Sequence, residues 1–172
     1  MSSRGRLEIE RKWLLAAPPS EEDLRALGAE SLRIEQMYLL GTPEAPVRRV
    51  RRTVHGDRVE YTYTEKRMLS GIVRIEGEVA IPEADYRRLL EEADPSRGPI
   101  RKTRHVFAYA GNTLEVDVFD RPPDLAVLEI EFDRSDAPAP ELPACLQVVR
   151  DVSEDPAYLN VTLARLAAPA AG

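Results

Sequence analysis

The sequence predicts a mainly β fold (α+β) with eight antiparallel strands and about three short helices. Apolar and charged residues alternate in short segments, as between Leu7 and Trp13, where Glu8, Glu10 and Lys12 share one side of a strand. Short turns separate most of these segments, which favours antiparallel pairing. The 172 residues, 43% of them hydrophobic, are enough for one domain. We expect that domain to cover residues 1–168, followed by a flexible tail at 169–172.

The eight expected strands cover residues 7–13, 32–40, 47–54, 59–66, 72–81, 101–109, 114–119 and 125–132. Pro18 and Pro19 follow the first strand, and Ser20 is expected to cap a short helix that Gly28 ends. The strand at 32–40 has mixed alternation, and residues 41–46 form a turn.

The strand at 47–54 contains five consecutive residues, 48–52, of which four are arginines. Alternation favours Arg49 and Arg51 on the charged side, but a register with Arg48 and Arg52 on that side stays open. A turn at 55–57 leads to the β-branched and aromatic strand 59–66.

The segment 72–81 alternates most clearly, with Arg74, Glu76 and Glu78 opposite apolar residues. Pro82 ends it and begins a helix that reaches about residue 93. Three further strands follow, and a proline-rich loop covers 137–143. Residues 155–156 begin a last helix, with Leu159, Leu163 and Leu166 expected on one face.

The charged side of the strands carries acids and bases in pairs two residues apart. The acids are Glu8, Glu10, Glu76, Glu78, Glu115, Asp117, Glu129 and Glu131, and the bases are Lys12, Arg49, Arg51, Lys66, Arg74, Lys102 and Arg104. In one architecture this side is simply solvated. In the other, the sheet closes into a barrel with the charged side inward. The residues alone leave both open.

The second architecture predicts a particular chemistry. Clustered carboxylates bind hard cations such as Mg²⁺ or Mn²⁺, whereas arginine and lysine bind phosphate oxygens. An enclosed site with both suits a complex of metal and polyphosphate, and transfer of a phosphoryl group to water.

In order along the chain, several segments resemble the CYTH superfamily, the triphosphate tunnel metalloenzymes. The matching segments are 8–12 (EIERK), 36–39, 49–51, 64–66, 74–78, 102–104, 114–119, 128–132 and 155–160. The resemblance implies an eight-stranded closed antiparallel barrel and hydrolysis or cyclisation of triphosphate compounds with a divalent metal. Among family members, the chain looks most like the short bacterial inorganic triphosphatases.

The resemblance also implies roles for individual residues. Glu8, Glu10, Glu129 and Glu131 would bind metal, and Glu76, Glu78 and Asp117 would hold a second metal or orient water. Phosphate would be bound by Lys12, Arg49, Arg51, Lys66, Arg74, Lys102 and Arg104. The expected catalytic set is Glu8, Glu10, Lys12, Glu78 and Lys102. Tyr38 is either a substrate-side group or a tyrosine at the edge of the core.

The function expected first is metal-dependent hydrolysis of inorganic triphosphate. Thiamine triphosphatase, nucleoside triphosphatase and class IV adenylate cyclase activities stay open on the same fold, as does a non-catalytic polyphosphate-binding module. The net charge of −6 argues against nucleic-acid binding, and no apolar run is long enough to span a membrane. The single Cys145 and the charged start fit a cytoplasmic protein. The apolar outer side of a barrel with few helices favours a homodimer.

Overall fold

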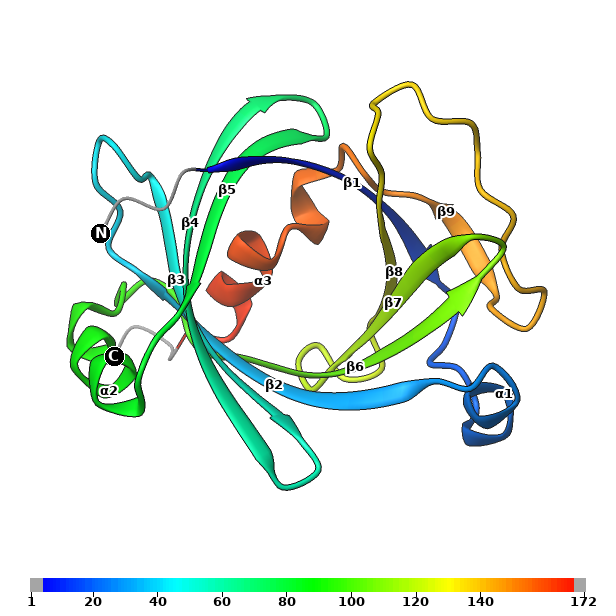
Figure 1. The fold of residues 1–172 in the computed structure, drawn as a ribbon, viewed down its shortest axis with the longest axis horizontal. Helices are drawn as coiled ribbons and strands as arrows, with labels where there is room; N and C mark the ends of the chain where they lie inside the picture. Colours follow the sequence, from blue (N-terminus) through cyan, green and yellow to red (C-terminus); the bar gives the residue numbers. More distant parts are fainter. Residues whose placement is uncertain (1–4, 169–172) are drawn as a thin grey trace.

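The computed structural model describes residues 5–168, and the expected tail at 169–172 lies outside them. Eight antiparallel strands close into a barrel, as the sequence predicts. They are β1 (Arg6–Leu15), β2 (Glu30–Leu39), β3 (Val47–His55), β4 (Arg58–Ser70), β5 (Val73–Ala80), β6 (Ile100–Tyr109), β7 (Asn112–Phe119) and β8 (Ala126–Glu131). The order around the barrel is β5-β4-β3-β2-β6-β7-β8-β1, and pairing of β1 with β5 closes it. Figure 1 shows the resulting ring.

A ninth strand was not expected from the sequence. The short β9 (Val148–Asp151) pairs with the end of β1 beyond the barrel. All four of its residues are exposed. The segment therefore has no alternation of buried and exposed positions that would identify it as a strand.

The helices are short and lie at the ends and sides of the barrel. They are α1 (Glu21–Ala26), α2 (Glu83–Leu89) with the 3₁₀ turn η1 (Leu90–Glu92), and α3 (Asn160–Leu166) after the 3₁₀ turn η2 (Pro156–Tyr158). Ser20 caps α1 as predicted, because its side chain accepts a hydrogen bond from the Asp23 amide over 3.1 Å. No helix within residues 5–168 is long and apolar enough to cross a membrane.

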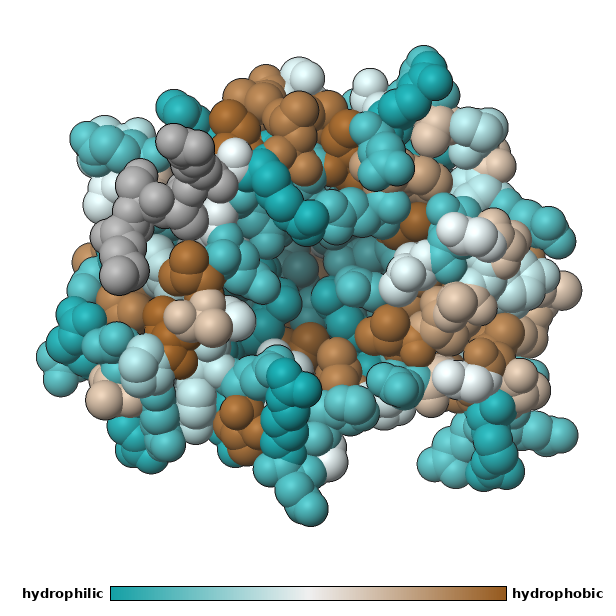
Figure 2. Space-filling model, in the orientation of Figure 1, coloured by the Kyte–Doolittle hydropathy of each residue, from teal (hydrophilic) through white to brown (hydrophobic). Residues whose placement is uncertain are grey.

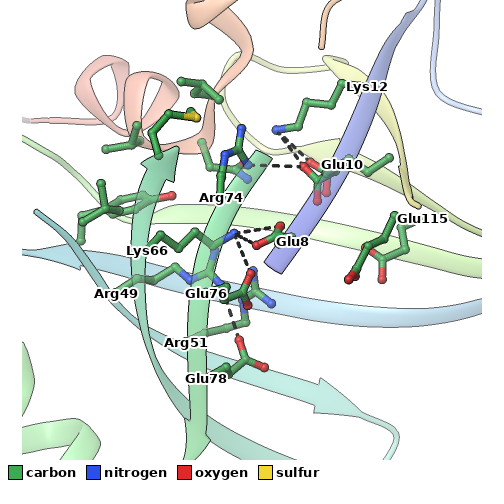
Figure 3. Close-up of a pocket in the computed structure, with 18 of the residues that line it drawn as sticks. Glu8, Glu10, Lys12, Arg49, Arg51, Lys66, Arg74, Glu76, Glu78 and Glu115 are labelled. Carbon is green, nitrogen blue, oxygen red and sulfur yellow. Dashed lines mark hydrogen bonds and ion pairs between the residues drawn. The ribbon is translucent and has the colours of Figure 1, made fainter. Parts of the chain in front are cut away.

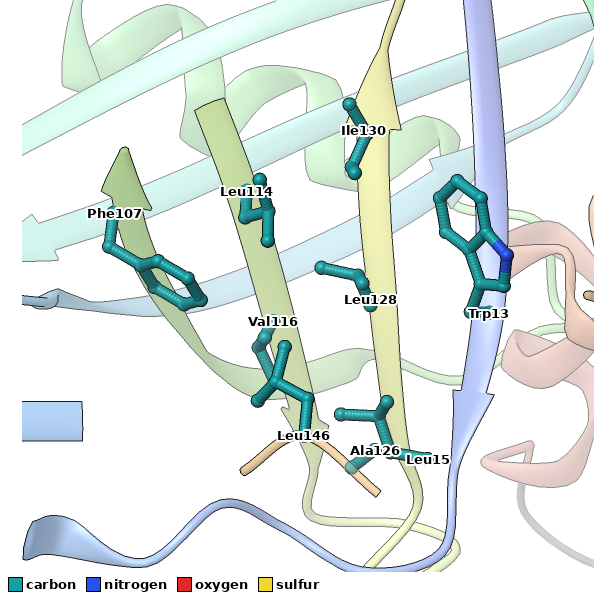
Figure 4. Close-up of a cluster of buried hydrophobic side chains, with 9 residues drawn as sticks. All are labelled: Trp13, Leu15, Phe107, Leu114, Val116, Ala126, Leu128, Ile130 and Leu146. Carbon is teal, nitrogen blue, oxygen red and sulfur yellow. The ribbon is translucent and has the colours of Figure 1, made fainter. Parts of the chain in front are cut away.

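The apolar side of the strands forms the outer layer of the barrel wall. On β1, β6, β7 and β8 a buried cluster contains Trp13, Phe107, Leu114 and Leu128, and Leu146 from the loop after β8 covers it (Figure 4). A second apolar area lies on β2 and β3, where Tyr86 of α2 covers Leu39 and Val50. With their apolar sides covered, the strands turn their charged sides inward.

The last helix closes one end of the barrel. Leu163 and Ala164 of α3 pack against Tyr38, Ile100, Phe119 and Val127, which continue the inward-facing rows of β2, β6, β7 and β8. In Figure 1, α3 accordingly lies inside the outline of the ring.

The helix differs from the prediction in two respects. Leu159 has an extended backbone that separates η2 from α3, and Leu166 is 68% exposed. Leu163 and Leu166 are three residues apart in α3 and stay on neighbouring positions of the helix, as expected, but only Leu163 is buried, because Leu166 is the last residue of the helix.

Candidate active site

A cavity of about 270 Å³ lies inside the barrel. Figure 2 shows a hollow lined by hydrophilic residues at the centre of one face. Seven carboxylates and seven cationic side chains line the cavity. They are Glu8, Glu10, Glu76, Glu78, Glu115, Glu129 and Glu131, with Arg6, Lys12, Arg49, Arg51, Lys66, Arg74 and Arg104. The structure thus brings together most of the residues that alternation predicted on the charged side.

Strands β3, β4 and β5 contribute a basic wall. Pairing of β3 with β2 and β4 places Arg49 and Arg51 opposite Tyr38 and Gln36, and both arginines line the cavity. Arg48 points outward, where its guanidinium contacts Glu92 at 2.9 Å. This answers the question of register that the arginine run left open.

Arg49 is a buried cation and Arg51 a half-buried one, and both have little compensating charge. Arg51 donates to the Gln36 side-chain oxygen over 3.0 and 3.3 Å, and no carboxylate within residues 5–168 lies within ion-pair distance of it. Burial, then the charges of Arg49 and Arg104, lowers the pKa of Arg51 to about 9. The Nε of Arg49 is buried without a hydrogen-bond partner among residues 5–168, while a terminal nitrogen of its guanidinium donates to the Thr64 hydroxyl over 3.3 Å and lies 3.6 Å from Glu78. An anion would compensate both charges.

Strands β1, β7 and β8 contribute an acidic wall. Glu10 lies directly opposite Glu131, and Glu129 directly opposite Glu115. Like charges in opposed positions destabilise a sheet unless a counter-charge lies between them. Arg104 supplies one for Glu115 and Glu129, at 2.6 and 3.2 Å, and Lys12 adds a positive charge 3.1 Å from Glu129 and 3.7 Å from Glu10.

The acids of this wall differ in their ionisation. Burial, and then the charge of Glu129, raises the pKa of Glu10 to about 7. Burial also acts to raise the pKa of Glu129, but Lys12 and Arg104 outweigh it and hold the pKa well below its usual range. Burial also raises the pKa of Glu115, so Glu10 and Glu115 are the carboxylates of this wall with the least compensating positive charge.

The basic and acidic walls meet between β1, β4 and β5. Lys66 lies 3.1 Å from Glu8 and 3.2 Å from Glu76, and Arg74 lies 3.9 Å from Glu10 (Figure 3). A second hollow, open on the side of the β6–β7 turn, shares Glu10, Glu115, Glu129 and Glu131 with the main cavity. The acidic wall is therefore accessible from two sides.

Two predicted site residues lie outside the cavity lining. Lys102 and Asp117 are fully buried, with 2.6 Å between Lys102 Nζ and Asp117 Oδ2. Arg104 binds the same carboxylate through two hydrogen bonds of 2.7 and 2.8 Å. Burial lowers the pKa of Lys102 to about 8, although Asp117 acts in the opposite direction. This buried cluster supports Arg104 from behind the cavity surface.

The closed end of the cavity contains residues for which sequence reasoning named no role. Leu159, Asn160 and Val161 line it together with Tyr38, which is 4% exposed and packs against α3. Glu115 was among the charged side chains but was not assigned to the site. Asn160 lies in segment 155–160, one of those that resemble the CYTH superfamily. The alternation that identified the charged residues applies only to strands, so it did not predict a role for Asn160 at the start of a helix.

The carboxylates on the cavity fit a divalent cation by their donor chemistry. Glu8, Glu10, Glu129 and Glu131 offer the oxygen ligands that Mg²⁺ and Mn²⁺ prefer. The Oε2 atom of Glu8 is buried and, within residues 5–168, has no hydrogen bond but an ion pair with Lys66 Nζ at 3.1 Å, so a cation there would take the place of this ammonium. Within the same residues, no three acidic, histidine or cysteine side chains already surround one point, since lysines and arginines alternate with the acids.

Among known proteins, this chain is similar to solved structures, although no family model and no curated protein matches its sequence. Two crystal structures of NE1496, one of them described as an inorganic triphosphatase, share 28% and 27% identity with this chain. Both matches cover 92% of this chain and 97% and 94% of theirs, with TM-scores of 0.54 and 0.53. PH1819 from Pyrococcus horikoshii OT3, at 20% identity, matches 75% of this chain and 80% of its own with a TM-score of 0.57, which shows a shared fold.

Proposed function

The chain has the CYTH-like triphosphate tunnel fold, and from this premise we propose that it is a divalent-metal-dependent triphosphatase acting on inorganic triphosphate. The observation that carries the proposal is the pair of poorly compensated guanidinium groups of the buried Arg49 and the half-buried Arg51, which face an acidic wall across an enclosed cavity. NE1496, which is described as an inorganic triphosphatase, supports this choice of substrate.

The charge balance of the cavity supports a metal complex as the ligand. Seven acids and seven bases nearly cancel, so a polyanion alone would leave the enclosed site strongly negative. A divalent cation bound with the polyanion removes this excess. Mg²⁺ or Mn²⁺ would be held by Glu8, Glu10, Glu129 and Glu131, and when bound would neutralise charge on the phosphoryl oxygens.

The residues of the basic wall would bind and orient the phosphates. Arg49 and Arg51 offer guanidinium donors in fixed orientation, which suits the paired oxygens of a phosphate. Lys66 and Arg74, at the meeting of the two walls, would contact the phosphate nearest the acids. When water attacks a terminal phosphorus, negative charge develops on the equatorial oxygens. The cations of the basic wall would stabilise this charge without having to move.

The acidic wall would orient the attacking water, with Lys12 between Glu10 and Glu129. Lys12 is 4% exposed and paired to both acids, so its ammonium keeps a fixed position at the cavity surface. Glu78, which accepts from the Thr64 hydroxyl over 2.9 Å, stands on the phosphate side beside Arg49.

The test is a substrate panel with and without metal. Purified protein is incubated with tripolyphosphate, pyrophosphate, thiamine triphosphate or ATP, in EDTA or with Mg²⁺ or Mn²⁺. We expect metal-dependent release of orthophosphate, fastest from tripolyphosphate. Tight binding without turnover would replace the proposal with a polyphosphate-binding module, and cyclic AMP with pyrophosphate from ATP would replace it with a cyclase.

A matched pair of variants links this activity to the cavity. Arg51→Gln removes an inward guanidinium, whereas Arg52→Gln removes its outward neighbour on the same strand. Tripolyphosphate hydrolysis should be lost in the first and kept in the second. Equal loss in both would show that the activity does not depend on the inward side of β3.

A further inference from the structure

The first residue of α3, Asn160, occupies an unusual position for an uncharged side chain. It lines the charged cavity at the end where α3 packs into the barrel. Its Oδ1 atom lies 3.4 Å from Nζ of the buried Lys102. The turn before Asn160 contacts a second buried lysine, Lys12, whose Nζ donates to the Tyr158 carbonyl over 3.4 Å.

The contact with Lys102 fixes which way the Asn160 amide points. A lysine ammonium is only a donor, so the side of the amide that faces it must be the oxygen. The amide nitrogen, with its two donor hydrogens, is thereby turned away from Lys102. Among residues 5–168 it has no hydrogen-bond partner, and the side chain borders the cavity.

The surroundings of Asn160 limit what this donor can bind. The neighbouring cavity residues on the α3 side, Leu159 and Val161, are apolar, as is Val47 on the adjoining strand. On the same strand as Val47, the next inward residue is Arg49, whose Nε lacks a partner. An NH₂ donor in a cavity that is also lined by Arg49, with its unpartnered Nε, suits an anionic oxygen.

We propose that Asn160 is a substrate-binding residue whose side-chain NH₂ donates to an oxygen of the terminal phosphate at the closed end of the cavity. This inference rests on the proposed function, and it adds a contact from α3 to the phosphate contacts made by the strands. Lys102 then acts as a positioning residue: from behind the cavity surface, it holds the Asn160 amide in the donating orientation.

The substitution Asn160→Asp separates this role from a structural one. An aspartate keeps the shape of the side chain and gives Lys102 a stronger acceptor, so the contact that anchors α3 is retained. It also replaces the donor with a second anionic oxygen, which repels phosphate. Gln147, which is exposed just before β9 and lines neither the cavity nor the second hollow, provides the charge-matched control Gln147→Glu.

Binding of tripolyphosphate is measured by calorimetry in EDTA and again with Mg²⁺, alongside thermal unfolding and kcat and KM. For Asn160→Asp we expect the melting temperature to stay at or above that of the wild type, and tripolyphosphate affinity to fall about tenfold or more. Asn160→Ala, which loses both the acceptor and the donor, should weaken binding and also lower the melting temperature. Gln147→Glu should leave affinity within about twofold of the wild type.

The outcomes distinguish this inference from the proposed function. If the wild type binds and hydrolyses tripolyphosphate while Asn160→Asp binds it equally well, Asn160 has only a structural role and the inference is wrong, although the proposed function stands. If the wild type neither binds nor hydrolyses tripolyphosphate, both are wrong. Weaker binding in Asn160→Asp with an unchanged melting temperature supports the inference.

Discussion

The guanidinium of Arg51 is held by the neutral side-chain oxygen of Gln36, over 3.0 and 3.3 Å, inside a barrel where most other cations are paired with carboxylates. Gln36 is completely buried on the neighbouring strand and orients Arg51 without neutralising it. Burying a charge without an ionic partner destabilises the fold. Here the loss of stability falls at a position where an anionic ligand would neutralise the charge, as expected of a binding site.

Arg51→Gln should therefore be at least as stable as the wild type without ligand. Tripolyphosphate should raise the melting temperature of the wild type, since saturation at about 100 times Kd corresponds to about 2.7 kcal/mol. The variant should lose this increase, because the guanidinium that the ligand would neutralise is gone. Thermal unfolding with and without tripolyphosphate measures both effects. A full ligand-induced shift in the variant would contradict the assignment of Arg51.

The pair formed by Lys12 and Glu129 allows stability and activity to be separated. Each side chain is 4% exposed, and their charged atoms are 3.1 Å apart. Glu129→Gln leaves Lys12 with only Glu10, 3.7 Å away, and Lys12→Met leaves Glu129 with only Arg104, 3.2 Å away. Each change alone should therefore cost stability, up to the about 3–5 kcal/mol of a broken buried pair. The double variant removes both charges and should recover much of that stability, as urea denaturation would measure.

Tripolyphosphatase activity should not recover in the same double variant. Each change removes a charge intended for the metal complex or the transition state, so we expect kcat to fall by about 100-fold or more in all three proteins. Recovery of activity along with stability would show that the pair is only structural.

The sequence predicted which side chains face inward but not how deep each one lies. Alternation assigns Lys102, Arg104 and Asp117 to the charged side as clearly as Arg49. Depth depends on the register between strands around the closed barrel, which a single strand does not encode. Thus Lys102 and Asp117 lie behind the cavity surface, whereas Glu115, two residues before Asp117, lines it.

The C-terminal part of the chain shows a second limit. Apolar spacing predicted one helix with Leu159, Leu163 and Leu166 on one face, but the extended backbone at Leu159 divides the segment, and only Leu163 of the three is buried. Which part of the face is buried depends on packing against the barrel end, a tertiary effect that local spacing does not contain. The same packing also brings Asn160 to the cavity.

The metal-free protein should lose stability as pH rises through the range in which Glu10 ionises. Its pKa is about 4.5 in the unfolded chain and is raised to about 7 in the folded one. The folded state therefore favours the protonated carboxyl, and the stability this gives below pH 4.5 is lost between pH 4.5 and 7. A shift of this size corresponds to about 3 kcal/mol. Urea denaturation in EDTA at pH 5 and pH 8 measures it, with Glu10→Gln as the comparison.

In Glu10→Gln this part of the pH dependence should be absent, so that the variant is relatively more stable than the wild type at pH 8. Addition of Mg²⁺ at pH 8 should stabilise the wild type more than the variant, because the cation binds the ionised carboxylate. Identical pH profiles for the two proteins would show that Glu10 keeps an ordinary ionisation when buried.

The last prediction concerns the buried cluster of Lys102, Asp117 and Arg104. Asp117 is the one acid between two cations, 2.6 Å from Lys102 and bound to Arg104 by two hydrogen bonds. Asp117→Asn leaves both cations without this counter-charge and should cost about 3–5 kcal/mol, whereas Lys102→Met leaves Asp117 paired with Arg104 and should cost less. Urea denaturation of the two variants tests this order. If Lys102→Met is the more destabilising change, the ammonium contributes more to the fold through Asn160 and the Phe119 ring, 5.2 Å away, than through its ion pair.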